Sequence, residues 1–113
     1  MSGTKIKICG LTRACDIQAA NEYRPDYIGF VFAKSRRQVS EEQAEVLAGQ
    51  LDPGIQAVGV FVNAPTEQVI RLLQKDVIQL AQLQGKESQE EIRFIQEKTG
   101  KPVIKAFSVE TIE

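Results

Sequence analysis

Cys9 is the first residue whose type and position could support chemistry. It ends the strand-like run "IKIC" and is followed directly by Gly10. A thiolate can act as a base or a nucleophile, and nearby cations would lower the thiol pKa from its usual value of about 8.5. Gly10 would let a ligand approach the backbone closely. The alternative is a small buried thiol that packs as a hydrophobic residue, and these residues alone leave both interpretations open.

Two further polar stretches could bind a ligand. The segment "KSRR" spans 34–37, where Arg36 or Arg37 could hold a carboxylate or phosphate with its bidentate guanidinium group. The spacing does not decide between the two arginines, and a solvated basic loop is the alternative. The segment "QLQGKE" spans 82–87 and contains Gln84, whose side-chain amide could orient a ligand. A lone glutamine of this kind is also common as an ordinary loop residue.

The composition limits the chemistry that these residues can perform. The chain has 113 residues, no histidine and two cysteines, Cys9 and Cys15. The absence of histidine excludes catalytic Ser-His and Cys-His pairs. Acid–base catalysis must therefore come from Cys, Asp, Glu, Lys or Tyr. With no histidine and only two cysteines, a structural zinc site is disfavoured, and we expect Cys15, within a helix, to be a small buried thiol.

The charge and hydropathy of the chain bear on partners and location. The net charge is −1, which argues against nucleic acid or an anionic membrane as a partner. No apolar run reaches the length of a membrane span, and "MSGTKIKICG" lacks the apolar core of a signal peptide. We therefore expect a cytoplasmic protein.

Apolar runs and helix signals alternate along the chain. The apolar runs predict buried parallel strands over 6–9, 27–32, 57–62, 80–83 and 103–107. The segments between them predict helices over 13–23, with Thr12 as cap, from Ser40, near Pro65 in a first turn, and from Ser88 to Gly100. Capping boxes are expected at "SEEQ", which ends on Gln43, and at "SQEE", which ends on Glu91.

This alternation predicts one α/β domain over residues 1–113, with parallel strands joined by right-handed helical crossovers. An open doubly wound sheet and part of a (β/α)8 barrel both fit. Both architectures place the functional site beyond the carboxyl ends of the strands. The residues expected there are Cys9 with Gly10, the basic loop 34–37, Asn63 and the segment "QGKE".

The same segments, taken together, resemble one enzyme family. "KICGLT", "GFVFAKSRRQVS", "VGVFVN", "QLQGKE" and "KPVIKAF" occur in the order and spacing of the phosphoribosylanthranilate isomerase family of tryptophan biosynthesis. The resemblance extends over essentially the whole chain, and the pair "KICGLT" and "SRRQVS" is highly specific. It implies a (β/α)8 TIM barrel, of which this sequence covers the first four βα units and the fifth strand.

The resemblance also implies a reaction and roles for particular residues. The family performs an Amadori rearrangement of N-(5'-phosphoribosyl)anthranilate to 1-(o-carboxyphenylamino)-1-deoxyribulose 5-phosphate, without a cofactor or metal. Cys9 would be the general base that removes the C2' proton of the ring-opened Schiff base. Arg37 would bind the anthranilate carboxylate, and Gly10 and Gln84 would contribute to substrate binding.

The sequence departs from the family pattern in two respects. The family usually has histidine at the position of Gln84, and an amide can donate and accept hydrogen bonds but does not change its charge near neutral pH. The family's general acid on strand 6 and its phosphate-binding loops after strands 7 and 8 match no position in this sequence. We therefore expect the 113-residue chain alone to have little isomerase activity.

Two other functions remain open on the sequence. One is a non-enzymatic α/β module that binds a phosphate or carboxylate ligand through the basic loop. The other is a half-barrel that self-associates, or pairs with a complementary chain, through its exposed edge strands.

Overall fold

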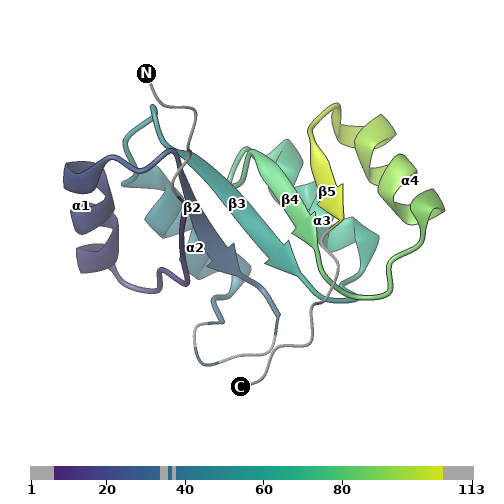
Figure 1. The fold of residues 1–113 in the computed structure, drawn as a ribbon, viewed down its shortest axis with the longest axis horizontal. Helices are drawn as coiled ribbons and strands as arrows, with labels where there is room; N and C mark the ends of the chain where they lie inside the picture. Colours follow the sequence, from purple (N-terminus) through teal and green to yellow (C-terminus); the bar gives the residue numbers. More distant parts are fainter. Residues whose placement is uncertain (1–6, 34–35, 37, 106–113) are drawn as a thin grey trace.

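The computed structural model describes residues 7–33, 36 and 38–105, with the backbone alone for residues 7–9. Strands and helices alternate along this part of the chain (Figure 1). The strands are β1 (Lys7–Cys9), β2 (Tyr27–Val31), β3 (Gln56–Phe61), β4 (Leu80–Leu83) and β5 (Val103–Lys105). The helices are α1 (Ala14–Tyr23), α2 (Glu41–Gly49), α3 (Thr66–Gln74) and α4 (Gln89–Thr99).

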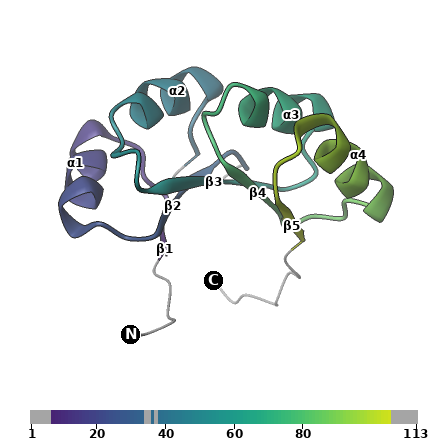
Figure 2. The same cartoon turned by 90° about the horizontal axis from the view of Figure 1, so that it is seen from above.

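The described strands form a parallel sheet in the order β1-β2-β3-β4-β5. The sheet is curved, and Figure 2 shows the four labelled helices along its convex side, with none of them on its concave side. A doubly wound sheet would carry helices on both faces. The structure therefore confirms the predicted segment of a (β/α) barrel.

The core lies between the sheet and the helices. Successive strand residues point to opposite faces, and the residues of β2, β3 and β4 that belong to the core cluster share one face in register. The helices contribute side chains with little or no solvent exposure to the same cluster. The cluster includes Ile17, Ile28, Phe30, Leu47, Ala57, Phe61, Leu73, Ala81, Leu83 and Ile95.

The N-terminus of α4 has the predicted capping box. The Ser88 hydroxyl accepts a hydrogen bond from the Glu91 backbone N–H, and the Glu91 carboxylate accepts one from the Ser88 N–H. The helix ends at Gly100, whose φ of 68° is left-handed, as expected of a glycine in this position.

The expected capping box at α2 is only half formed. Ser40 accepts a hydrogen bond from the Gln43 N–H, as predicted. The Gln43 side chain, however, donates to the Thr12 carbonyl oxygen at 2.9 Å. It thereby ties the start of α2 to the segment after β1, a partner that is distant in sequence.

Two predicted helix starts are wrong by one residue. The cap of α1 is Arg13 rather than Thr12, because the Asp16 carboxylate accepts hydrogen bonds from both of their backbone N–H groups. Pro65 is the cap of α3 rather than part of its first turn, since its ψ of 138° is extended.

The predicted strand ends also need correction. β2 ends at Val31, one residue before the predicted end, and β3 runs from Gln56 to Phe61, one residue before the predicted 57–62. In β1 and β5 the predicted residues 6, 106 and 107 lie outside the described residues. None of the described helices is both long and apolar enough to cross a membrane.

Gly59 lies in β3 where there is no room for a side chain. A Cβ there would lie 2.6 Å from Ile78 Cδ1 and 2.9 Å from Phe61 Cε2. The ring of Phe61 also stacks on that of Phe32, with centroids 5.1 Å apart. A side chain at residue 59 would therefore disturb the carboxyl half of the sheet, where the strands lead into the loops.

Gly59→Ala should lower the free energy of unfolding by about 1–3 kcal/mol, because the added methyl overpacks the core. Gly49→Ala is the matched control, since no atom lies within 4 Å of its Cβ position at the end of α2. It should be neutral or stabilise by up to about 1 kcal/mol through helix propensity. Urea unfolding followed by circular dichroism measures both, and equal effects would contradict this packing argument.

Candidate active site

The candidate site lies at the edge of the sheet where the parallel strands end. In register, Cys9 pairs with Gly29, and Phe61 pairs with Leu83, which pairs in turn with Lys105. Parallel strands bring their carboxyl ends to the same edge. The loops after β1, β2, β3 and β4 therefore all begin at this edge.

Cys9 is the last residue of β1, directly before a tightly held glycine. The Gly10 N–H donates to the Gly29 carbonyl oxygen at 2.9 Å, and Gly10 has a φ of 83°. This left-handed conformation favours glycine. The backbone therefore changes direction at Gly10, immediately after Cys9. The side chain of Cys9 lies outside the described atoms, so the catalytic role of Cys9 stays a prediction.

The basic loop starts and returns at the end of β2. Phe32 donates its N–H to the Val60 carbonyl oxygen, Gln38 forms a parallel bridge with Val31, and Val39 donates to the Val31 carbonyl oxygen. Arg36 is exposed. Arg37 lies outside the described residues, so its role in carboxylate binding stays a prediction.

Gln84 follows β4 directly and is half-buried. Its N–H donates to the Phe61 carbonyl oxygen at 2.9 Å, which continues the ladder between β3 and β4 by one residue. Three strand spacings separate β4 from β1, roughly 14 Å along the sheet. The role of Gln84 in substrate binding stays a prediction.

A polar cluster at this edge joins Asn63, Gly85 and Glu87, which the sequence placed here, with Lys105, which it did not. Glu87 accepts hydrogen bonds from the Asn63 N–H at 2.7 Å and the Gly85 N–H at 2.8 Å. It also forms an ion pair with Lys105 at 3.1 Å, and the Lys105 ammonium donates to the Gly85 carbonyl oxygen. We call these four residues, Asn63, Gly85, Glu87 and Lys105, the Glu87 clamp.

The Glu87 carboxylate is charged although its side chain is only 5% exposed. Burial raises the pKa of Glu87, but hydrogen bonds from the backbone N–H groups of Glu87 itself, Asn63 and Gly85 and from the Lys105 side chain outweigh it, so the pKa lies below its usual value. One sequence signal could have revealed the cluster: an acid just beyond β4 and a lysine on the neighbouring strand.

Other candidate groups do not join this edge as a metal or thiol site. Cys15 is a free thiol on α1 and is exposed, so the expectation that it is buried is wrong. Within the described ranges, no group of three or more His, Cys, Asp or Glu side chains could hold a metal ion.

Comparison with known proteins identifies the family. The family model for N-(5'-phosphoribosyl)anthranilate (PRA) isomerase matches residues 6–113. The curated N-(5'-phosphoribosyl)anthranilate isomerase of Lachnoclostridium phytofermentans is 43% identical over 109 residues, which cover 96% of this chain and 50% of the relative. That of Thermoanaerobacter sp. strain X514 is 51% identical over 88 residues, 78% of this chain and 43% of the relative. The chain thus spans about half the length of the curated relatives it matches.

Solved structures give the same result. The isomerase of Thermus thermophilus is similar with a TM-score of 0.84 and 39% identity, covering 95% of this chain and 53% of that one. A phosphoribosylanthranilate isomerase crystallised with reduced 1-(o-carboxyphenylamino)-1-deoxyribulose 5-phosphate has a TM-score of 0.82 and 37% identity, covering 90% and 52%. The chain therefore belongs to the N-(5'-phosphoribosyl)anthranilate isomerase family, whose fold is the TIM barrel.

Proposed function

We propose that the protein acts in tryptophan biosynthesis as a phosphoribosylanthranilate isomerase. The reaction is the Amadori rearrangement of N-(5'-phosphoribosyl)anthranilate to 1-(o-carboxyphenylamino)-1-deoxyribulose 5-phosphate. The observation that carries the proposal is the position of Cys9 at the carboxyl end of β1, in a chain whose family model extends over residues 6–113. This edge is where barrel enzymes place their catalytic groups.

The proposed base is the Cys9 thiolate. It removes the C2' proton of the ring-opened Schiff base, and the electron pair of that C–H bond moves toward the iminium nitrogen to give the enolamine, which then tautomerises to the ketose. The left-handed turn at Gly10 directs the chain away from the strand end directly after Cys9.

Two further groups would hold the substrate. Arg37 binds the anthranilate carboxylate through its guanidinium group, and the loop that contains it is anchored at the end of β2 by the Val31–Gln38 bridge. Gln84, beyond the end of β4, orients the substrate through hydrogen bonds from its neutral amide. No step in this scheme requires a cofactor.

A cytoplasmic location is part of the proposal. A thiolate base at Cys9 works only in its reduced form, and Cys15 is also a free thiol. Reducing compartments maintain both in that form.

A second candidate function is a half-barrel that requires a complementary chain. In the part of the sequence that the structure describes, β1 pairs only with β2 and β5 pairs only with β4. Ile104 of β5 is 46% exposed. A polypeptide of residues 1–113 would then gain isomerase activity when the complementary barrel half is added.

In an active isomerase polypeptide that contains residues 1–113, Cys9→Ala should abolish most of the activity, because alanine has no proton acceptor. Cys9→Ser should be nearly as inactive, since a serine hydroxyl is a far weaker base than a thiolate at neutral pH. We expect losses of at least about 10²-fold in kcat. Cys15→Ser is the matched control and should retain parental turnover. Product formation from freshly prepared phosphoribosylanthranilate measures all three, and near-parental turnover by Cys9→Ala would remove Cys9 from the mechanism.

Arg37→Ala should act mainly through substrate binding. Loss of a charge-assisted hydrogen bond of about 1.5–3 kcal/mol corresponds to roughly 10–150-fold in kcat/KM. Arg36→Ala tests the neighbouring arginine, which is exposed, and should change kcat/KM by less than about threefold. Steady-state kinetics of both variants decide the assignment, and a reversed order of effects would transfer the carboxylate site to Arg36.

A polypeptide of residues 1–113 should self-associate through its edge strands if the second candidate holds. Ile104→Lys places a charge on the exposed edge of β5 and should shift the sedimentation equilibrium toward monomer. Val46→Lys is the control, since Val46 is 61% exposed on α2, away from the sheet edge. A purely monomeric parent polypeptide at about 100 μM, a concentration where edge-strand aggregation is expected, would eliminate self-association.

A further inference from the structure

The Glu87 clamp joins three neighbouring strands at the edge where catalysis is proposed. Asn63 follows the end of β3 by two residues, Gly85 and Glu87 follow β4, and Lys105 is the last residue of β5. The clamp therefore contains one carboxylate that holds the ends of three strands through charge-assisted hydrogen bonds.

Both sides of the Gly85 residue are fixed by this clamp. Its N–H donates to Glu87 Oε1, and its carbonyl oxygen accepts from the Lys105 ammonium. A Cβ on Gly85 would lie 2.7 Å from the backbone nitrogen of Asn63, so the two loops touch without room for a side chain. The position of Gly85 relative to β3 and β5 is thus closely defined.

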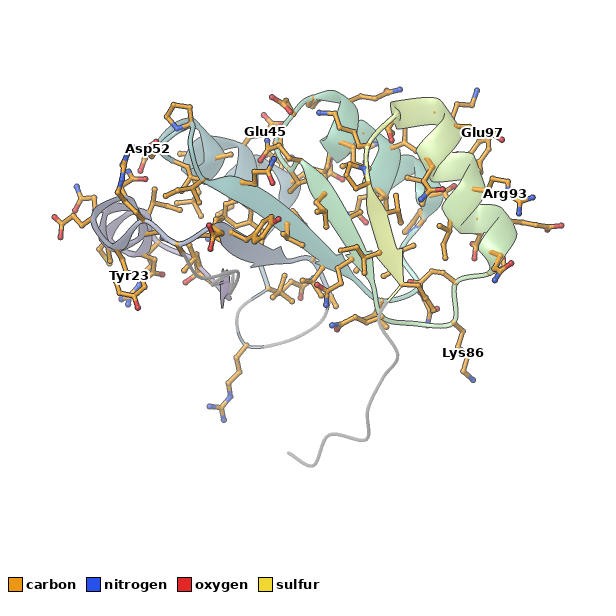
Figure 3. The ribbon with its side chains drawn as sticks, turned by 45° about the horizontal axis from the view of Figure 1, so that its top comes forward. Tyr23, Glu45, Asp52, Lys86, Arg93 and Glu97 are labelled. Carbon is orange, nitrogen blue, oxygen red and sulfur yellow. The ribbon has the colours of Figure 1, made fainter. Side chains whose placement is uncertain are left out.

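Asn63 reinforces the same arrangement from the other loop. Its φ of 52° is left-handed, a conformation that asparagine tolerates better than most residues. In this conformation its N–H donates to Glu87 Oε2 while its side-chain oxygen accepts from the Lys86 N–H at 2.7 Å. Figure 3 shows the Lys86 side chain pointing away from the protein, so only its backbone takes part.

Gln84 is the residue that these contacts hold in place. Its own N–H is bound to the Phe61 carbonyl oxygen, and the next residue, Gly85, is bound on both sides. The backbone of Gln84 therefore has little freedom, and its side chain projects from a fixed point at the strand ends. A loop without these hydrogen bonds would let the Gln84 amide move, and a misplaced amide would bind and orient a substrate less well.

We propose that Glu87 is a positioning residue for substrate binding, which acts by fixing the loop that carries Gln84. This inference rests on the proposed isomerase function and assigns Glu87 no contact with the substrate. Its carboxylate accepts from the backbone N–H groups of Asn63 and Gly85 and pairs with the Lys105 ammonium. A glutamine has one acceptor oxygen and no charge, so Glu87→Gln leaves at least one of these donors unpaired.

The test is a double-mutant cycle with Glu87→Gln, Gln84→Ala and the double variant, made in an active isomerase polypeptide that contains residues 1–113. Each single variant should raise KM about tenfold, the order of one lost charge-assisted hydrogen bond, with kcat changed less than about twofold. If Glu87 acts through Gln84, the KM of the double variant should also be only about tenfold above the parental value. Independent effects would multiply to about a hundredfold, and that outcome would overturn the proposal.

A second readout separates positioning from general stability. In Glu87→Gln, amide hydrogen exchange at Asn63 and Gly85 should accelerate at least about tenfold, while amides in the middle of β3 keep their rates. Glu97→Gln on α4 is the charge-matched control, because Glu97 is exposed and labelled on the outer side of the helix in Figure 3. It should leave KM and both exchange rates at parental values.

The outcomes distinguish this proposal from the function on which it rests. A parent polypeptide without isomerase activity overturns the proposed function, and the exchange rates then decide whether the clamp exists. An active parent whose KM is unchanged by Glu87→Gln or by Gln84→Ala overturns the positioning role while the proposed function stands. Uniform acceleration of exchange across the sheet also overturns it, because Glu87 would then be a stabilising residue alone.

Discussion

The parallel register of the strands is the constraint on which the rest of the structure depends. Each strand hydrogen-bonds to the next in the same direction, so all carboxyl ends meet at one edge. The helices return the chain along the convex face alone (Figure 2). Because the crossovers are of one hand and the strand order never reverses, the helices stay on one face, and every loop that carries a candidate site residue begins at the same edge.

The core makes this register the stable one. A slip of one residue in a strand would turn the buried side chains of β2 and β3 from the helices to the concave face. Phe30 and Phe61 have no solvent exposure, and Gly59 leaves space for Ile78 and the ring of Phe61. Packing of the core thus fixes the positions of the strand ends from which the loops begin.

At the carboxyl edge of the sheet, hydrogen bonds and an ion pair of Glu87 hold the loops in place. Two residues beyond β3 and β4, the backbone N–H groups of Asn63 and Gly85 donate to the Glu87 carboxylate. The lysine on the adjacent strand end compensates the charge of the buried carboxylate, which would be costly to bury alone. The loops after β3 and β4 therefore behave as one polar unit that extends the order of the sheet toward the substrate side.

The sequence by itself determined the elements and their order, because their signals are local. The capping box at Ser88, the glycine at the end of α4 and the apolar run of β4 each depend on residues a few positions apart. The motif pair around Cys9 and the basic loop was enough to indicate the family. The contacts of Gln43 with Thr12 and of Glu87 with Asn63 and Lys105 were not predicted, because these partners lie 31, 24 and 18 residues away. Only the folded sheet, by aligning strand ends that are distant in sequence, decides which of these polar groups meet.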